Sequence, residues 1–537
     1  MPRSPYRIAR RLSVILLVCL TACGGGGGGG SPAATTPHME PPREASSGSD
    51  SSLWPPAVDD GPHCDTQPLV GRGRTFNVGP GQTYTELHQL PWNDMAGGDV
   101  VNVFYRVTPY ASRVGLRVQA TADAPFHLHG VAQAGTCARP MLSGAGARPS
   151  DDQQTNRFGA AVEGLGLVAI TRGPTDQEDE HRAAWIVIEN IRFQDVGADH
   201  QFVAYNGTQR SYNAFSAAIY AVRVAHLTVR NCEFVRTAMG VFVNSRGQHP
   251  LDHSDDVRLI RNRFEANGHV GSDTIHSTYV QARRALYEGN DLPQLRPGAG
   301  GSTLKDRSSA TVVRFNRIVS NARALDLVET EEEYVSAVQD DPLYPHAWVY
   351  GNLIINDFNQ PNGASVNMVH FGYDNTAERA RRGTLYFYGN TLVQAGSQSR
   401  AWYAQVFQLS RVTPAPQVQA WSNVFAQLGT VEFRFMGEAG ELLLRGRNTA
   451  PPDWVAVYPG NPGTVQTSGG TLLLVANPGL DADFRLQSGS AARSAAIHPG
   501  VTWPTDITPN HLALSHQFDA VSGVRPRRTT LDLGAFE

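Results

Sequence analysis

The segment LTVRNCEF, residues 227–234, places alternating apolar residues before and after an asparagine, and this short pattern recurs along much of the chain. The same arrangement is found in IVIENIRF (186–193), RLIRNRF (258–264), VVRFNRI (312–318), WVYGNLII (348–355), LYFYGNTLV (385–393) and QAWSNVF (419–425). With Asn290 added, the asparagines lie at 190, 231, 262, 290, 316, 352, 390 and 423, separated by 26 to 41 residues. Self-similarity at such periods is typical of solenoids and propellers.

The repeats predict an all-β fold, a right-handed parallel β-helix (solenoid) over residues 63–537. No helical pattern separates the strand-like segments, which disfavours βαβ units, and the signatures of propeller blades are missing from the sequence. A variable interval fits coils that carry loops of different length. The asparagines are expected to be structural, because Asn tolerates the left-handed turn conformation and its amide can bond the next Asn in a ladder.

A short helix is expected to cap the N-terminal end of the solenoid, at Thr83–Leu90. Thr83 and Glu86 fit a capping box, and Tyr84, Leu87 and Leu90 form an apolar stripe. Such a cap would cover strand edges that the first coil otherwise leaves unpaired.

Residues 1–22 predict the signal peptide of a bacterial lipoprotein. The basic RIARR (7–11) precedes the apolar LSVILLVCL (12–20), which is too short to span a bilayer, and LTAC (20–23) matches a lipobox. Cys23 would then be lipidated, whereas an ordinary secretory signal ending in Cys is the alternative. Gly24 in place of Asp favours the outer membrane. Loss of the four arginines in this segment changes the formal net charge from −4 to −8.

Residues 23–62, which are rich in Gly, Pro and Ser, predict a flexible tether to the membrane. Export permits disulfides, and Cys64–Cys137 is the favoured pair because Cys232 lies in an apolar strand pattern; three free thiols are the alternative.

The composition, 41% hydrophobic and 18% charged over 537 residues, is that of a globular protein with a large core. No basic stripe, no phosphate-binding loop between strand and helix, and no zinc-ligand spacing occurs in the sequence. Nucleic acid, nucleotide and structural zinc are therefore not expected, and a monomer is expected.

Several stretches resemble exported bacterial right-handed parallel β-helix proteins of the pectate-lyase-like superfamily, a subgroup often described as polysaccharide-degrading. They are VGPGQTYTELHQLPWNDMAGGDVV (78–101), WIVIENIRF (185–193), HSTYVQA (276–282), STLKDRSSATVVRFNRIVSNARALDLVE (302–329), GTLYFYGNTLV (383–393), DFRLQSGSAARSAA (483–496) and DLGAFE (532–537). The resemblance implies the β-helix fold and a polysaccharide partner. It does not imply one reaction, because this fold carries lyases, hydrolases, esterases and adhesins.

Lys305 is the single lysine of the chain and lies in a Lys-Asp-Arg triplet. Arginine cannot replace a lysine that must lose its proton, so this position is a candidate for catalysis. His276 and Tyr279 precede it by about one coil, and Asp326 and Glu329 follow it by about one coil. Because equivalent positions of successive coils stack about 4.8 Å apart, these residues and Arg307 are expected in one outward-facing patch. Asp306 would point inward as a buried Asp, unless the triplet lies in a turn.

This patch suits β-elimination of an acidic, uronate-containing glycan. The reaction needs a base for the proton beside the carboxylate, a cation on the carboxylate and an acid for the leaving oxygen. Lys305, whose pKa the neighbouring Arg307 would lower, is the expected base; Lys305, Arg307, His276, Tyr279 and Asp326 form the candidate catalytic set. Arg323, Glu329, His370 and Asp374 are the candidate substrate-binding residues.

Three further interpretations stay open. A glycoside hydrolase would use two carboxylates from Asp306, Asp326, Glu329 and Asp374. A non-catalytic surface β-helix lipoprotein that binds glycan or has a structural role would use Lys305 and Arg307 to link coils by ion pairs with Asp306 and Asp326. Related β-helix lyases combine Lys and Arg with calcium, for which Asp326, Glu329 and the ETEEE run (329–333) supply candidate ligands, although that run also fits a solvated loop.

Overall fold

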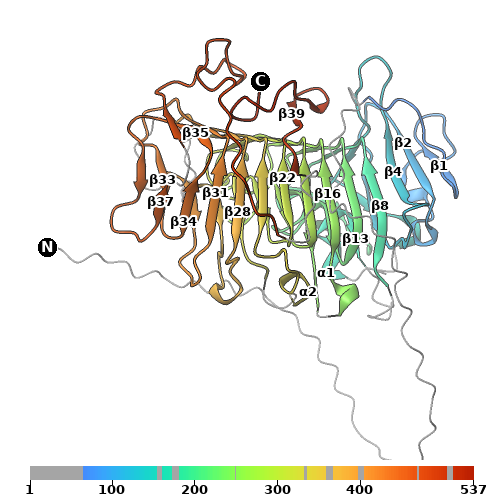
Figure 1. The fold of residues 1–537 in the computed structure, drawn as a ribbon. Helices are drawn as coiled ribbons and strands as arrows, with labels where there is room; N and C mark the ends of the chain where they lie inside the picture. Colours follow the sequence, from blue (N-terminus) through green and yellow to red (C-terminus); the bar gives the residue numbers. More distant parts are fainter. Residues whose placement is uncertain are drawn as a thin grey trace, which may run out of the picture. The chain divides into compact units, whose positions relative to one another are not determined.

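The computed structural model describes residues 64–153, 160–171, 181–247, 249–331, 336–357, 367–396, 404–467, 471–504 and 512–537. The predicted signal peptide and the whole predicted tether, with Cys23, lie outside the described residues. Within them, the chain forms a right-handed parallel β-helix whose strands stack coil upon coil (Figure 1). The predicted fold class is confirmed. None of the described helices has the length and apolar character needed to cross a bilayer.

Three parallel sheets build the coils. Sheet 1 contains β1 (Thr75–Val78), β2 (Val100–Phe104), β4 (Phe126–Val131), β8 (Ala183–Glu189), β13 (Val224–Arg230), β16 (Asp255–Ile260), β19 (Arg283–Glu288), β22 (Thr311–Arg314), β25 (Ala347–Tyr350), β28 (Thr384–Tyr388), β31 (Gln417–Trp421), β34 (Glu441–Leu444) and β37 (Thr464–Gln466). Sheet 2 contains β6 (Arg148–Pro149), β3 (Ser112–Leu116), β7 (Gly166–Ile170), β12 (Ala217–Val222), β15 (Met239–Asn244), β18 (Thr278–Val280), β21 (Leu304–Asp306), β24 (Leu325–Leu327), β27 (Asn367–Phe371), β30 (Gln405–Leu409), β33 (Arg434–Met436) and β36 (Val455–Val457). Sheet 3 contains β5 (Met141–Ser143), β9 (Arg192–Gln194), β14 (Glu233–Val235), β17 (Arg263–Glu265), β20 (Asp291–Leu292), β23 (Arg317–Ser320), β26 (Leu353–Asn356), β29 (Thr391–Gln394) and β32 (Val424–Gln427).

Smaller elements decorate the coils. The remaining strands are β10 (Gln201–Val203), β11 (Gln209–Ser211), β35 (Arg447–Ala450), β38 (Thr471–Leu474), β39 (His516–Asp519) and β40 (Gly523–Pro526). The short helices are η1 (Leu87–Gln89), η2 (Trp92–Asp94), η3 (Asp151–Gln153), α1 (Ala160–Glu163), η4 (Pro250–Asp252), α2 (Ser336–Gln339) and η5 (Ala377–Arg379).

Each central coil runs from sheet 2 to sheet 1 to sheet 3, as in β12, β13 and β14. Every second side chain of a strand points into the coil, where apolar residues of successive coils form one continuous core. Phe193, Phe234 and Phe264 stack in this interior with ring centroids 5.3 and 4.9 Å apart. The alternation of the repeated segments therefore reflects strands with one buried face.

Asparagines line the turn between sheet 1 and sheet 3. Their side-chain amides donate to the next asparagine at 2.9 to 3.2 Å, in a ladder through Asn262, Asn290, Asn316, Asn352, Asn390, Asn423 and Asn448. The predicted ladder is confirmed for the residues from Asn262 to Asn423, and Asn448 extends it.

Asn190 and Asn231 do not belong to this ladder, contrary to the prediction. The backbone N–H of Cys232, not that of Asn231, donates to Asn262 Oδ1 at 3.0 Å. Asn190 and Asn231 have φ values of 58° and 52° and occupy the preceding, left-handed position of the turn, which Gly289 fills with a φ of 64° in a later coil. Asn and Gly both tolerate left-handed backbone, so Asn occurs at this position of the turn because of its backbone conformation. At the next position of the turn, Asn occurs because of its hydrogen bonds in the ladder.

The N-terminal cap is present but smaller than predicted. Only η1 is helical within the expected Thr83–Leu90, and its capping box is formed by Glu86 and Gln89 rather than by Thr83 and Glu86. Tyr84 instead makes a parallel bridge to Val78, which holds it in extended conformation. Leu87, Leu90 and Trp92 are buried and close the end of the core.

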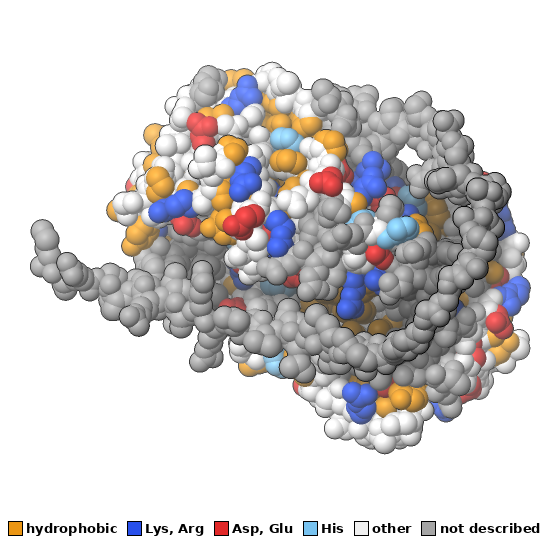
Figure 2. All heavy atoms as spheres, turned by 90° about the horizontal axis from the view of Figure 1, so that it is seen from below, with side chains coloured by type: hydrophobic (Ala, Val, Ile, Leu, Met, Phe, Trp, Pro, Cys, Tyr) orange, Lys and Arg blue, Asp and Glu red, His pale blue; other side chains and the backbone are white. Residues whose placement is uncertain are grey.

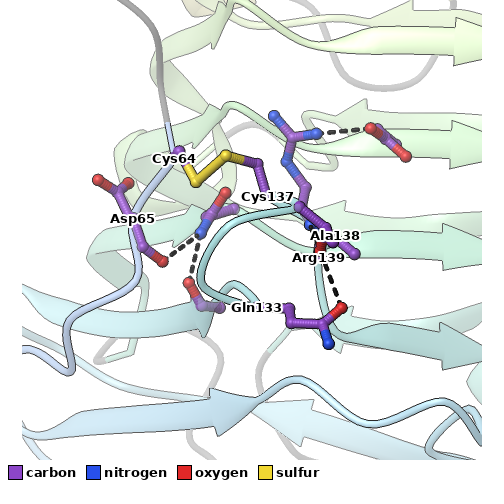
Figure 3. The surroundings of a disulfide bond; sticks show 10 residues. Cys64, Asp65, Gln133, Cys137, Ala138 and Arg139 are labelled. Carbon is purple, nitrogen blue, oxygen red and sulfur yellow. Dashed lines mark hydrogen bonds and ion pairs between the residues drawn. A yellow bond between two sulfur atoms is a disulfide. The ribbon is translucent and has the colours of Figure 1, made fainter.

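A disulfide joins Cys64 to Cys137, as the cysteine pattern favoured, and Cys232 is a buried free thiol. Figure 3 shows how the disulfide ties the first described residues to the loop after β4. The Asn190 amide donates to the backbone carbonyls of Asp65 at 3.1 Å and Gly130 at 2.5 Å beside it. The N-terminal segment is thereby held against the first coils.

The C-terminal segment covers the outer faces of two sheets. Leu512, Leu514 and Val524 pack on the aromatic rows of sheet 1. Leu533 and Phe536 pack on the outward apolar residues of sheet 3. The outward charged residues predicted from the sequence lie on the remaining sheet, sheet 2.

Candidate functional site on the outer face of sheet 2

The predicted patch lies on one outward row of sheet 2. Tyr279 pairs with Lys305, Lys305 with Asp326, and Asp326 with His370 in the parallel register of β18, β21, β24 and β27. The one-coil spacing deduced from the sequence is therefore confirmed as a structural relation. The nine predicted site residues are brought together in one cluster of contacts, although their catalytic and binding roles stay predictions.

Lys305 and Asp306 lie in strand β21, and Arg307 directly follows the strand, so the triplet is not in a turn. Lys305 faces outward on β21, while Asp306 is fully buried inside the coil. Asp306 accepts hydrogen bonds from Tyr287 at 3.0 Å and from Thr311 at 2.5 Å, and it pairs with buried Arg381 at 3.2 Å. This interior ion pair removes Asp306 from the carboxylates available to a surface reaction.

The Lys305 ammonium bridges two carboxylates. Its Nζ donates to Asp326 Oδ2 at 2.8 Å and to Asp374 Oδ2 at 2.5 Å, and its side chain is only 4% exposed. Two carboxylates in contact stabilise a charged amine. The predicted role of Lys305 as a neutral amine base is therefore not the role that this geometry favours.

Asp326 is fully buried and orients His370. Asp326 Oδ1 lies 2.8 Å from His370 Nδ1, and its Oδ2 accepts from Ser302 Oγ at 3.0 Å. Burial alone would raise the pKa of Asp326, but Lys305, Arg323 and His370 together hold that pKa well below its usual value. Because Asp326 is ionised, its Oδ1 accepts the hydrogen bond from His370 Nδ1, and Nε2 lies outside this contact.

Glu329 organises the loop that follows β27. Its carboxylate accepts the backbone N–H groups of Asp374 at 2.8 Å and of Asn375 and Thr376 at 2.7 Å, and pairs with Arg307 at 3.2 Å. Both oxygens are thus engaged by donors. Glu329 positions the loop and is fully buried, so direct substrate binding is not what these contacts favour.

The contacts of Asp326 and Glu329 do not fit a calcium site either. Calcium needs several free oxygen ligands, and all four carboxylate oxygens of these residues accept hydrogen bonds from the protein. No group of three or more His, Cys, Asp or Glu side chains within the described residues is arranged to hold a metal ion. Residues 332 and 333 of the acidic run lie outside the described residues.

Asp374 is the most exposed carboxylate of the cluster, at 26% of its side chain. Arg307 approaches its Oδ2 at 3.3 Å, and Arg323 approaches its Oδ1 at 4.0 Å, in addition to the Lys305 contact. Burial and Asp326 oppose its ionisation, but Lys305 and Arg307 prevail and lower the pKa of Asp374. Three cations thus converge on one carboxylate that reaches the surface.

His276 and Tyr279 flank the cations. His276 is buried, and its Nδ1 accepts the Ser302 backbone N–H at 2.8 Å. Burial, and next the Lys305 charge, lower the pKa of His276 well below its usual value. Burial and the Glu331 carboxylate raise the pKa of Tyr279 well above its usual value, so its hydroxyl keeps the proton.

The neutral His276 predicts a pH dependence of stability. Between the usual pKa of 6.5 and the lower pKa in the folded protein, the unfolded chain binds a proton that the folded chain does not. The stability that the neutral His276 contributes is fully present above its usual pKa. It is lost as the pH falls from that pKa to the pKa in the folded protein, by up to about 1.4 kcal/mol of unfolding free energy per pH unit.

The difference in unfolding free energy between about pH 7.5 and about pH 5 should therefore be smaller in His276→Gln than in the natural protein. Gln keeps an acceptor for the Ser302 N–H but does not titrate. An equal pH dependence in both proteins would contradict the interpretation.

Sequence reasoning missed Ser302, which links His276 to Asp326 and is marked by no motif. Glu331 was named only within the ETEEE run of candidate calcium ligands, and it lies beside Arg307 at 3.8 Å. On the face seen in Figure 2, the described Lys, Arg, Asp and Glu side chains are interspersed with apolar ones, and no patch of a single charge sign dominates it.

No protein-family model matches this chain, and no curated protein sequence matches it. Solved structures with a similar fold include GH136 lacto-N-biosidase from Eubacterium ramulus, with 10% identity, a TM-score of 0.40, and coverage of 75% of this chain and 68% of that chain. A rhamnogalacturonan lyase has 8% identity, a TM-score of 0.39, and coverage of 75% and 87%. Pectate lyase Pel9A has 10% identity, a TM-score of 0.38, and coverage of 87% and 96%. These similarities concern the fold alone.

Proposed function

We propose that this protein is a lyase that cleaves uronate-containing polysaccharides by β-elimination on the outer face of sheet 2. The observation that carries the proposal is the buried Asp326–His370 pair at 2.8 Å, which lies within two coil steps of three cations that converge on Asp374. An oriented histidine beside a carboxylate-binding cluster supplies both a base and an electrostatic stabiliser.

The substrate carboxylate would bind by taking over the cation contacts of Asp374. The cluster has no spare positive charge, because its three cations form ion pairs with three carboxylates. The cations are Lys305, Arg307 and Arg323, and the carboxylates are Asp326, Glu329 and Asp374. Asp374 is the exposed member, and its displacement from the cations frees them for an acidic sugar. The cations then stabilise the negative charge that develops on the substrate carboxylate when the neighbouring C–H bond breaks.

The elimination requires a base for one proton and a source of one proton for the leaving oxygen. His370 Nε2 takes the proton from the carbon beside the carboxylate, the C–H electron pair forms a carbon–carbon double bond, and the C4–O bond to the next sugar breaks. The leaving oxygen takes its proton from solvent water, because Tyr279 lies three coil steps, about 14 Å, from His370 along the row and does not reach the same sugar ring. Lys305 remains an ammonium throughout.

A screen of polygalacturonate and alginate tests the proposal. The expected product carries a conjugated double bond that absorbs in the ultraviolet. New reducing ends without that absorbance would instead indicate a glycoside hydrolase. Binding without either product would indicate a non-catalytic glycan-binding protein and would contradict the lyase proposal.

The location is also a proposal: export and anchoring of the protein through a lipid on Cys23, at the outer membrane. The support is the lipobox at 20–23 with its preceding basic and apolar segments. The Cys23→Ser variant should leave the membrane fraction, and retention there would contradict the anchor.

A further inference from the structure

We propose that a cavity beneath the C-terminal hairpin binds a neutral sugar unit. The hairpin consists of β39 and β40, and its turn lies against the corner at which the coils pass from sheet 1 to sheet 3. The candidate cleavage site lies on sheet 2, which is another side of the coils. The cavity is therefore separate from the proposed reaction, and the inference does not rest on that reaction.

The cavity has a volume of about 250 Å³. Residues 518–523 of the hairpin turn form one wall. The other wall comes from the corners of three successive coils, at residues 231–233, at 261–263, and at Gly289 and Asp291. Sites for drug-sized ligands measure about 300–1,000 Å³, so the size of this cavity suits a single sugar unit rather than a long chain.

Packing fixes the hairpin over the coils. Val524 is fully buried among apolar residues on the outer face of sheet 1, and Phe518 is buried among those of sheet 3. Gly523 has a φ of 78°, and a Cβ atom at this position would lie 2.3 Å from Arg261 Cγ. A larger residue would push the hairpin away from Arg261, so glycine permits the close approach. The cavity is thus built into the fold.

The walls of the cavity carry both signs of charge in equal number. Three guanidinium groups and three carboxylates line it, namely Arg139, Arg261, Arg263, Glu233, Asp291 and Asp519. An anion would meet the carboxylates, and a cation would meet the guanidinium groups. In the part of the chain that the structure describes, no group of three or more His, Cys, Asp or Glu side chains is arranged to hold a metal ion. The lining therefore favours an uncharged ligand that forms many hydrogen bonds.

Two ion pairs at the cavity are too long for direct hydrogen bonds. Arg263 Nη1 lies 3.7 Å from Asp291 Oδ2, and Arg525 Nε lies 3.8 Å from Asp519 Oδ2. The hydrogen bonds that these two carboxylates accept from the described residues all go to Oδ1. A hydroxyl group fits between such partners, because it accepts from the guanidinium and donates to the carboxylate.

A sugar ring matches these groups. Its hydroxyls both donate and accept, and its C–H groups are apolar. Val521, at the tip of the hairpin, lines the cavity and is 70% exposed, so it offers the C–H groups an apolar contact. Water can bridge the same charged partners. A sugar replaces several waters with one molecule and also covers the Val521 side chain.

The test measures binding of D-glucose, D-galactose, D-mannose and N-acetyl-D-glucosamine by saturation-transfer NMR, followed by titration with a sugar that binds. D-galacturonate and phosphate are the acidic comparisons. Asp519→Asn and Asp291→Asn each replace one accepting oxygen by an amide of the same size. In Asp519→Asn, the remaining oxygen still accepts the N–H groups of Val521 and Ser522. Each variant should weaken sugar binding about tenfold, the scale of one hydrogen bond to a charged group.

Asp255→Asn is the matched control, because Asp255 also forms a long ion pair, 3.9 Å to Arg283, but does not line the cavity. The His370→Gln variant at the candidate cleavage site is the second control. Both should bind the sugar as tightly as the natural protein does. Melting temperatures show whether each variant folds, and if one Asn variant of the cavity does not, the other decides.

Sugar binding that the folded cavity variants retain at full strength would place the ligand elsewhere and overturn the inference. A lack of binding by all four neutral sugars would also overturn it and would indicate a cavity that holds water only. Tighter binding of galacturonate or phosphate than of the neutral sugars would overturn the ligand class. None of these results bears on the lyase proposal, which the products of cleavage test.

Discussion

The His370→Gln variant is expected to lose β-elimination activity by about 10²–10⁴-fold, the usual contribution of a positioned general base. Gln preserves an N–H donor for Asp326 but has no basic nitrogen to accept the substrate proton. The loss should fall on kcat, because His370 is not among the groups that hold the substrate carboxylate. Ultraviolet absorbance of the unsaturated product measures it directly.

The neighbouring Asp326→Asn variant separates orientation from basicity. It removes the charge that keeps the proton on His370 Nδ1 at 2.8 Å, so it should also lower kcat. His346→Gln is the control, since His346 is a half-buried histidine directly before β25, and its Nδ1 accepts the backbone N–H of Thr384 at 3.2 Å. Activity that survives in His370→Gln would show that another group takes the proton.

The sequence predicted the fold and the position of the site for one physical reason. Strands with one buried face produce the alternation, and stacking of equal coils turns a distance in sequence into a neighbour in space. Tyr279, Lys305 and Asp326 could therefore be placed together from spacing alone.

The same reasoning could not predict contacts between residues that are separated by loops of variable length. Asp374 reaches Lys305 from 69 residues away through a loop that Glu329 holds by three backbone N–H groups. Arg381 reaches Asp306 from 75 residues away inside the coil. Neither register nor composition indicates where such a loop returns, so the burial of Lys305 and the exposure of Asp374 could not be predicted.

The Lys305→Met variant should lower the free energy of unfolding by about 3–5 kcal/mol, because it breaks a buried ion pair and leaves the partner charges uncompensated. Asp326 is fully buried, and the cation that remains beside it is Arg323, at 3.5 Å. Asp374 would also lose its shortest contact, at 2.5 Å. Chemical denaturation at neutral pH measures the effect.

The Lys305→Arg variant distinguishes two roles of Lys305, a fixed cation and the base that takes the substrate proton. Arg preserves the positive charge, so a larger part of the stability should survive in Lys305→Arg than in Lys305→Met. If Lys305 acts only as a fixed cation, the folded Arg variant also keeps measurable β-elimination, since His370 remains the base. A stable Arg variant with activity as low as that of His370→Gln would instead assign proton abstraction to the lysine, because a guanidinium cannot release its proton at working pH.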